Sequence, residues 1–265
     1  MKHVFFILCM LILSISYAQD RVFTYTYQSN VLNSGQKEIE IWTTMNTGRE
    51  HYYRGFKNRV EFEIGLGKKL QTSFYLNSDY AKGIEEANGS EYSFENNEHS
   101  FSNEWKLKLS DPVANRVGSA LYFEYTLAPS ATELEGKLIF DKQTNNFIQA
   151  FNIVGEYEFE KEFENNGDEI EVENEKELTV ELNYGLSYKI NKNLFLGLEL
   201  FNQNEITDSE VEHSILLAGA GFSYFTKGFW VNFSILPQVT DFTMNKPDLE
   251  DHERIQGRLI FAYEF

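Results

Sequence analysis

The chain has 265 residues and a formal net charge of -18, from 41 acidic and 23 basic side chains. A surface this negative repels nucleic acid and phosphate headgroups, which argues against a nucleic-acid-binding function. Aromatic residues make up 15% of the chain and charged residues 24%, a combination typical of a protein wall with one apolar and one wet face.

The opening residues, MKHVFFILCMLILSISYAQD, predict a secretory signal peptide over residues 1–18. Lys2 gives the positive start, residues 4–15 form an apolar core, and Ser16-Tyr17-Ala18 is a small-x-small cleavage site. This apolar run is short for a membrane-spanning helix and no later run is longer, so no helical span is expected. The single cysteine, Cys9, lies in the signal, and we therefore expect no disulfide or thiol chemistry in the mature chain.

Residues 19–35 precede the first strand of the predicted barrel. In this segment Phe23, Tyr25 and Tyr27 alternate with polar residues. The period fits an additional strand, and a periplasmic segment or a small plug inside a barrel are the alternatives. A plug would favour a gated or closed channel.

Residues 36–265 are dominated by a period of two. In RVEFEIGLG, residues 59–67, Val60, Phe62 and Ile64 alternate with charged residues. The same alternation begins at residues 38–46 and recurs along the chain, which predicts about twelve strands, an even number as closed bacterial barrels require.

The connections between these strands alternate in length. Short links are expected near 67–69, 110–117, 142–146, 190–193 and 226–228, and longer, more acidic links near 78–98, 161–176, 202–213 and 239–252. The pattern predicts a closed antiparallel transmembrane β-barrel in the outer membrane of a Gram-negative bacterium, with short periplasmic turns and longer acidic outer loops. The alternative, a soluble β-sandwich, predicts strands of about five or six residues, shorter than several of these runs.

The last predicted strand, RLIFAYEF, is apolar at alternate positions: Leu259, Phe261, Tyr263 and Phe265. This set resembles the C-terminal signature that outer-membrane assembly machinery recognises. The resemblance implies that this machinery is a partner, together with outer-membrane lipid.

A second resemblance lies near the mature start. Phe23, Tyr25 and Tyr27 form an F-x-Y-x-Y entry; Gly35, Glu38, Glu40 and Trp42 form a G-x-x-E-x-E-x-W strand; and residues 70–77 form an L-Q-x-x-x-Y-L-N strand. These motifs resemble the opening of an uncharacterised family of bacterial outer-membrane β-barrels. The resemblance implies class and location, because that family has no assigned activity.

If the apolar face meets lipid, the opposite face lines the lumen. The candidate lumen-lining residues are Arg59, Glu61, Glu63, Glu104, Lys106, Glu124, Glu135, Lys137, Glu156, Glu158, Glu181, Glu199 and Arg258. Acids outnumber bases in this set, which favours the passage of cations if the lumen is open. The alternative is that these groups pair across a narrow, filled interior.

No motif for a nucleophile elbow, a zinc protease or a phosphate-binding loop occurs, so we predict no catalytic residue, no cofactor and no metal site. The histidines His51, His99, His213 and His252 fall near expected outer loops and are interpreted as solvated residues. The acidic run at residues 161–177 makes divalent cations candidate partners. Aromatic belts at the membrane interfaces are expected from Trp42, Trp105, Trp230, Tyr75, Tyr80 and Tyr224.

The leading functional hypothesis is a porin-like passive channel for small polar or cationic solutes, without a chemical step. The alternative is a non-transporting structural or adhesive surface barrel that acts through its acidic outer loops. A membrane-embedded hydrolase using His99 or His213 is the third hypothesis.

Overall fold

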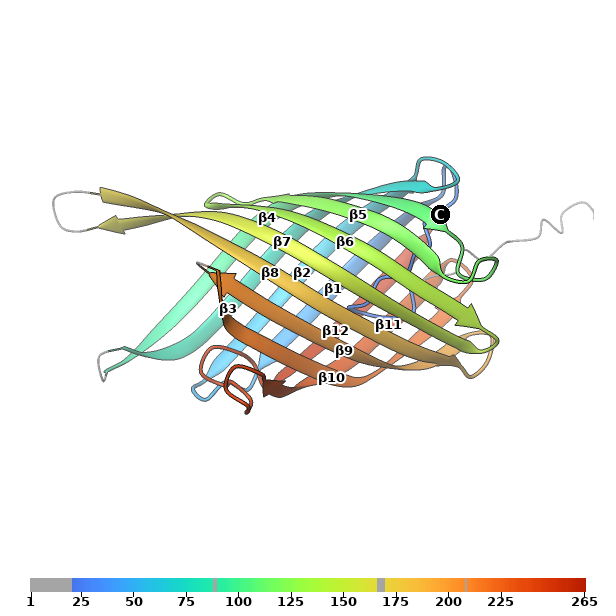
Figure 1. Cartoon of the computed structure of the whole chain (residues 1–265). Coiled ribbons are helices and arrows are strands. Elements are labelled where there is room, and N and C mark those ends of the chain that lie inside the picture. Colours follow the sequence, from blue (N-terminus) through green and yellow to red (C-terminus); the bar gives the residue numbers. More distant parts are fainter. Residues whose placement is uncertain (1–20, 88–89, 166–169, 208) are drawn as a thin grey trace, which may run out of the picture.

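The protein is a closed β-barrel. The computed structural model describes residues 21–87, 90–165, 170–207 and 209–265, without the side chains of 87, 162–165 and 170–174. Within these ranges twelve antiparallel strands each pair with their sequence neighbours, and β1 closes the ring against β12 (Figure 1). The strands are β1 (Lys37–Thr47), β2 (Tyr53–Gly65), β3 (Leu70–Ala87), β4 (Ser90–Ser110), β5 (Gly118–Leu127), β6 (Ala131–Thr144), β7 (Phe147–Asn165), β8 (Ile170–Lys189), β9 (Leu194–Thr207), β10 (Glu210–Thr226), β11 (Phe229–Asp241) and β12 (Ile255–Glu264). The predicted fold class is thereby confirmed.

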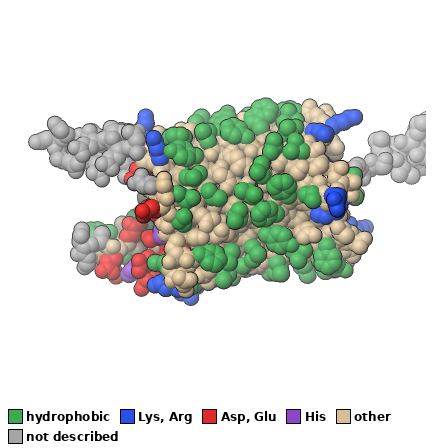
Figure 2. Space-filling view, viewed as in Figure 1, with side chains coloured by type: hydrophobic (Ala, Val, Ile, Leu, Met, Phe, Trp, Pro, Cys, Tyr) green, Lys and Arg blue, Asp and Glu red, His purple; other side chains and the backbone are tan. Residues whose placement is uncertain are grey.

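Large apolar side chains face outward on every strand and form a lipid-facing belt. One exposed member from each strand, in order from β1 to β12, is Ile41, Val60, Leu76, Trp105, Phe123, Leu138, Phe151, Leu182, Leu198, Phe222, Ile235 and Phe261. Figure 2 shows these hydrophobic side chains spread over the middle of the wall. A closed ring leaves no unpaired backbone edge in the bilayer, so the belt and the closure together suit a transmembrane barrel.

The polar segments expected to be long outer loops are largely paired strand. β3 runs to Ala87 and β4 starts at Ser90, and β7 and β8 likewise pair up to Asn165 and Ile170. Above the lipid both faces of a hairpin meet water, so the backbone ladder continues there without the apolar alternation that revealed the strands within the membrane. The link at residues 242–254, between β11 and β12, is the long connection without a strand in the described ranges.

Strand β10 is apolar on both faces in the sequence, and the structure resolves its orientation. Phe222 and Tyr224 point to the belt, whereas Ile215, Leu217 and Phe225 are buried inside the barrel. The three aromatic side chains Trp42, Trp230 and Tyr75 also point inward and are buried, so they do not form the expected interface belts. Period two alone does not say which face of a strand meets lipid.

Residues 1–18, the predicted signal peptide with Cys9, lie outside the described residues. No helix among the described residues is long and apolar enough to cross a bilayer.

Candidate functional site

The barrel interior is filled by an apolar cluster near the short turns. It includes Ala120, Tyr122, Ile139, Ile148, Ala150, Phe195, Phe225, Trp230, Ile260 and Ala262 from the strands, and Val22, Phe23 and Tyr27 from residues that precede β1. Most of its strand members lie within a few residues of a short connection, at the end of the barrel assigned to the periplasm. An apolar core at this end leaves little room for water.

Most of residues 21–35, the N-terminal segment, lies inside the barrel, and its last three residues, Asn33, Ser34 and Gly35, are exposed. No residue from 21 to 36 is in a strand, and Phe23 is 1% and Thr26 0% exposed. The additional strand or periplasmic extension expected here is not formed by these residues. The physical reason is that β1 and β12 already pair with each other, so the ring has no free edge for another strand.

Glu199 of β9 holds the N-terminal segment through its backbone. Its carboxylate oxygens accept hydrogen bonds from the backbone N–H groups of Thr24 (2.8 Å), Tyr25 (2.8 Å) and Thr26 (3.0 Å). The Thr24 hydroxyl donates a further bond at 2.9 Å. Three successive N–H groups around one buried anion satisfy the charge and fix the local chain conformation.

A second anchor is the amide of Asn152 on β7. Its oxygen accepts from the N–H of Tyr27 at 2.6 Å, and its NH₂ group donates to the Tyr27 carbonyl at 2.9 Å. The ring of Tyr27 lies edge-on to Tyr122, with centroids 5.3 Å apart, and Arg21 stacks 3.9 Å above its centre. Buried polar groups of the segment thus find partners on the barrel wall.

The N-terminal segment touches the inner face of all twelve strands. The wall residues that contact it, in order from β1 to β12, are Trp42, Gly65, Gln71, Lys106, Tyr122, Lys137, Asn152, Gly185, Glu199, Ser223, Asn232 and Arg258. A segment with contacts to every strand of a closed ring crosses the lumen.

Beyond this segment the lumen widens into a polar cavity of about 410 Å³, called the vestibule below. Its charged lining residues are Lys57, Arg59, Asp79, Glu124, Glu133, Glu135, Lys137, Glu156, Glu158, Glu177, Glu181 and Arg258. Eight of these are acids and four are bases. Some are paired: Lys137 Nζ lies 2.9 Å from Glu135, and Arg59 Nη2 lies 3.7 Å from Glu124. Acidic groups remain in excess after this pairing.

The thirteen candidate lumen-lining residues fall into three groups. Arg59, Glu124, Glu135, Lys137, Glu156, Glu158, Glu181 and Arg258 line the vestibule, and Glu63 and Lys106 line a smaller cavity of about 60 Å³ beside Arg21 and Tyr27. Glu61, Glu104 and Glu199 are buried on the inner wall, each at most 3% exposed. Whether they line an open passage stays a prediction.

The four residues of the predicted assembly signal lie together on the outside of the barrel. Leu259, Phe261, Tyr263 and Phe265 are all exposed, and the side chains of Tyr263 and Phe265 stack with centroids 6.1 Å apart. Their recognition by assembly machinery stays a prediction.

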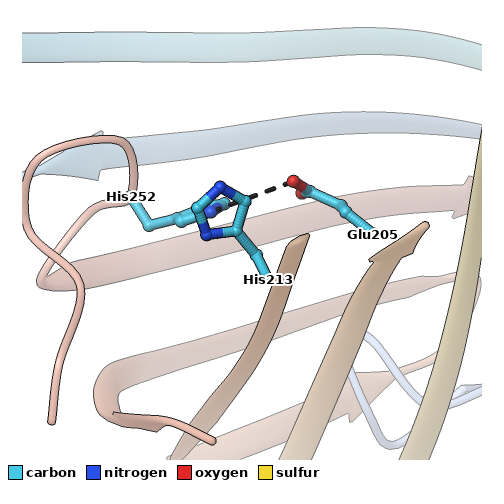
Figure 3. A group of neighbouring side chains, drawn as sticks. All are labelled: Glu205, His213 and His252. Atoms are coloured by element: carbon cyan, nitrogen blue, oxygen red, sulfur yellow. Dashed lines mark ion pairs between the residues drawn. The ribbon is translucent and has the colours of Figure 1, made fainter. Parts of the chain in front are cut away.

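At the outer rim the structure brings two of the four histidines together. The imidazoles of His213 and His252 lie 4.7 Å apart between centroids, and Glu205 faces them (Figure 3). Asp241 and Asp248 complete this rim cluster. His213 and His252 are therefore partly buried side chains rather than solvated loop residues. His99 lies on β4, which is not a neighbour of β10, so the two histidines named for a hydrolase are not adjacent.

Burial acts on the two carboxyls at this rim in the same direction, with different outcomes. Burial raises the pKa of Glu205, and Glu177 adds to the rise while His252 opposes it. Burial would also raise the pKa of Asp241, but hydrogen bonds from the hydroxyl and N–H of Thr243 lower it overall. Asp241 is therefore the more firmly ionised of the two.

The sequence matches a family model over residues 15–265, that of a family of unknown function (DUF6662). The chain belongs to this family. Among curated proteins none matches it.

Solved structures share the fold of this DUF6662 chain at low identity. The COG4313 outer membrane channel from Pseudomonas putida F1 has a TM-score of 0.59 and 9% identity, covering 92% of this chain and 100% of that one. The translocator domain of the autotransporter NalP from Neisseria meningitidis has a TM-score of 0.58 and 14% identity, covering 88% and 90%. The KdgM porin in complex with disordered oligogalacturonate has a TM-score of 0.52 and 12% identity, covering 86% and 99%. The lipid-facing belt and this shared fold place the chain among outer-membrane β-barrels.

Proposed function

We propose that this barrel is a passive outer-membrane channel for small polar or cationic solutes, held closed by its own N-terminal segment. The observation that carries the proposal is the arrangement along the lumen, with an acidic vestibule on one side of a segment that touches every strand. Fold neighbours that are channels support the transport class. Val22, Phe23 and Tyr27 of this segment are part of the apolar cluster that fills the lumen near the short turns. When the segment leaves the wall, these side chains leave the cluster with it, and solute passes.

The excess of acids in the vestibule sets the expected selectivity. Rings of carboxylates lower the energy of a cation in a narrow pore and raise that of an anion. Neutralising Glu133, Glu158 and Glu177 together, as glutamines, should therefore move the reversal potential in asymmetric KCl toward zero. The measurement is single-channel recording of the refolded mature protein in a planar bilayer.

The matched control neutralises three carboxylates outside the vestibule, Glu85, Glu91 and Glu210, which are exposed on the outer ends of strands. This control should keep the cation preference, because exposed charges are screened by salt. An anion preference, or a selectivity that the vestibule variant leaves unchanged, would contradict the proposal.

The filled lumen favours a second candidate, a non-transporting surface barrel that acts through its outer end. The conductance of variants that release the N-terminal segment distinguishes the two candidate functions. A demonstrably folded barrel that conducts no ions even after the segment is released would support the surface protein and exclude the channel.

A further inference from the structure

The rim cluster combines side chains from four separate parts of the fold. Glu205 comes from β9, His213 from β10 and Asp241 from the end of β11, while Asp248 and His252 come from the β11–β12 link. Asp241 is 0% and Asp248 2% exposed. Two buried carboxylates side by side at the rim are costly unless something offsets the charge.

In Asp241 and Asp248 one carboxylate oxygen, Oδ1, accepts hydrogen bonds from neighbouring residues. The other oxygen, Oδ2, points toward the histidines. Asp241 Oδ1 accepts from the N–H and the hydroxyl of Thr243, both at 2.7 Å. Asp248 Oδ1 accepts from the N–H of Glu250 at 3.0 Å. The Oδ2 atoms of both residues are buried and make no hydrogen bond. Fixing one oxygen in this way is how proteins orient a carboxylate toward a metal ion.

The histidines face these oxygens with equally unsatisfied atoms. Nδ1 of His213 and Nε2 of His252 are buried and also lack a hydrogen-bond partner. Four orphaned donor or acceptor atoms at one point are rare in folded proteins, where buried polar atoms are almost always paired. A direct His–Asp hydrogen bond would relieve two of them, but at 3.4 and 3.5 Å the atoms lie farther apart than in an ordinary N–H···O bond.

Two of the four spacings among these atoms match those of ligands around one metal ion, and the other two are a few tenths of an ångström longer. Ligand atoms bound tetrahedrally at about 2.0 to 2.2 Å lie about 3.3 to 3.6 Å from one another. Nδ1 of His213 lies 3.4 Å from Asp248 Oδ2 and 3.5 Å from Asp241 Oδ2. Nε2 of His252 lies 3.8 Å from Asp248 Oδ2 and 3.9 Å from Glu205 Oε2.

We propose that the rim cluster binds one divalent transition-metal ion of the zinc class, with Glu205, His213 and His252 as ligands and Asp241 and Asp248 as flanking carboxylates that face His213. Two imidazole nitrogens select such an ion over Ca²⁺ and Mg²⁺, which prefer all-oxygen sites. The carboxylates offset the charge of the ion.

The ion would fasten the β11–β12 link across the outer mouth. That link is already held on one side, at the β1–β2 connection beside β12, because Glu253 pairs with Arg49 at 2.9 Å and the Leu249 carbonyl accepts from the N–H of Glu50 at 2.6 Å. A metal bond to β10 would hold the second side. The site does not depend on whether the lumen conducts.

The test is calorimetric titration of Zn²⁺ into the refolded mature protein in detergent, after heat-modifiable gel mobility has verified the barrel. We expect saturable binding of one ion per chain, weakened by more than about tenfold in His252→Asn and in Asp248→Asn. Co²⁺ bound in the same site should give visible absorption bands of a tetrahedral ion, and these bands should be lost in the variants.

The matched control is His99→Asn, which removes an exposed histidine on β4 and should leave the affinity unchanged. No saturable Zn²⁺ binding by the folded wild type, or affinity retained by the double variant His213→Asn/His252→Asn, would overturn the proposal. Ca²⁺ binding in place of Zn²⁺ would overturn the assignment of the metal class.

Discussion

At the scale of single residues, Glu199 anchors the N-terminal segment with four hydrogen bonds. A buried carboxylate with four donors in contact makes charge-assisted bonds, each worth about 1.5 to 3 kcal/mol, and their loss leaves the backbone N–H groups buried without partners. Glutamine in its place keeps one acceptor oxygen and turns an NH₂ group toward N–H donors. A substitution of nearly identical size therefore converts an anchor into a repulsive contact.

We predict that Glu199→Gln exposes the segment. The probe is a cysteine at Thr26, which is 0% exposed and whose hydroxyl makes no hydrogen bond, so that the Thr26→Cys change removes no contact of this kind. Maleimide should label this thiol slowly in the folded wild-type background and at least tenfold faster with Glu199→Gln, as expected for a loss of about 1.4 kcal/mol or more. Glu158→Gln, in the vestibule, is the control and should leave the rate unchanged. Equal rates in all three backgrounds would show that Glu199 does not hold the segment.

The period-two pattern identified the charged residues of the inner face but could not identify their contacts. Glu199 and Thr24 are 175 residues apart in the chain, and no local signal links an inward glutamate to a particular backbone segment. The rim cluster could not be predicted from the sequence for the same reason. His213 and His252 belong to different elements, and their spacing in the chain matches no metal-binding motif. Only the closed ring brings such residues together.

At the scale of elements, the N-terminal segment fills space inside the barrel that would otherwise be a cavity. Phe23 packs against β8 at Gly185, where the absence of a side chain makes room for the ring: a Cβ there would lie 2.7 Å from Phe23 Cδ1. The alternation of Phe23, Tyr25 and Tyr27 predicted a strand, but these side chains instead point to different parts of the surrounding ring. Alternating apolar and polar residues are typical of a strand, but a segment inside a barrel can have the same alternation.

Two glycines on neighbouring strands offer a matched pair of variants. Gly185→Ala should displace Phe23 and destabilise the barrel by about 1 to 3 kcal/mol, the usual cost of overpacking. Gly155→Ala, on β7, meets nothing within 4 Å and should change stability by less than about 0.5 kcal/mol. Urea unfolding of both variants, followed by tryptophan fluorescence, measures the difference. Similar stabilities for the two variants would contradict the packing of Phe23 against β8.

The strands themselves were predictable for a physical reason. Lipid demands an apolar side chain at every second position, so β2, β5 and β12 carry that pattern in their sequences. The outer ends of β3, β4, β7 and β8 meet water on both faces, so their sequences do not need an apolar side chain at every second position. They were expected as loops, and the structure pairs them.

At the scale of the whole molecule, the barrel combines a closed lower half with an open, acidic upper half. The apolar cluster and the N-terminal segment block the lumen near the short turns, and the vestibule opens toward the long hairpins. In the channel proposed above, opening the passage requires movement of a segment that is not part of the wall. The wall itself, with every strand paired on both sides, can stay intact during that movement.

The most direct test is to lock the segment to the wall and measure ion conductance. Thr24 Oγ1 lies 2.5 Å from Ser234 Oγ, so Thr24→Cys/Ser234→Cys should form a disulfide that joins the segment to β11. We predict that the oxidised double variant conducts no ions in a planar bilayer, that reductant restores the openings, and that the conductance of each single-cysteine control is the same with and without reductant. Oxidised and reduced protein with the same conductance would contradict the claim that the N-terminal segment closes the channel.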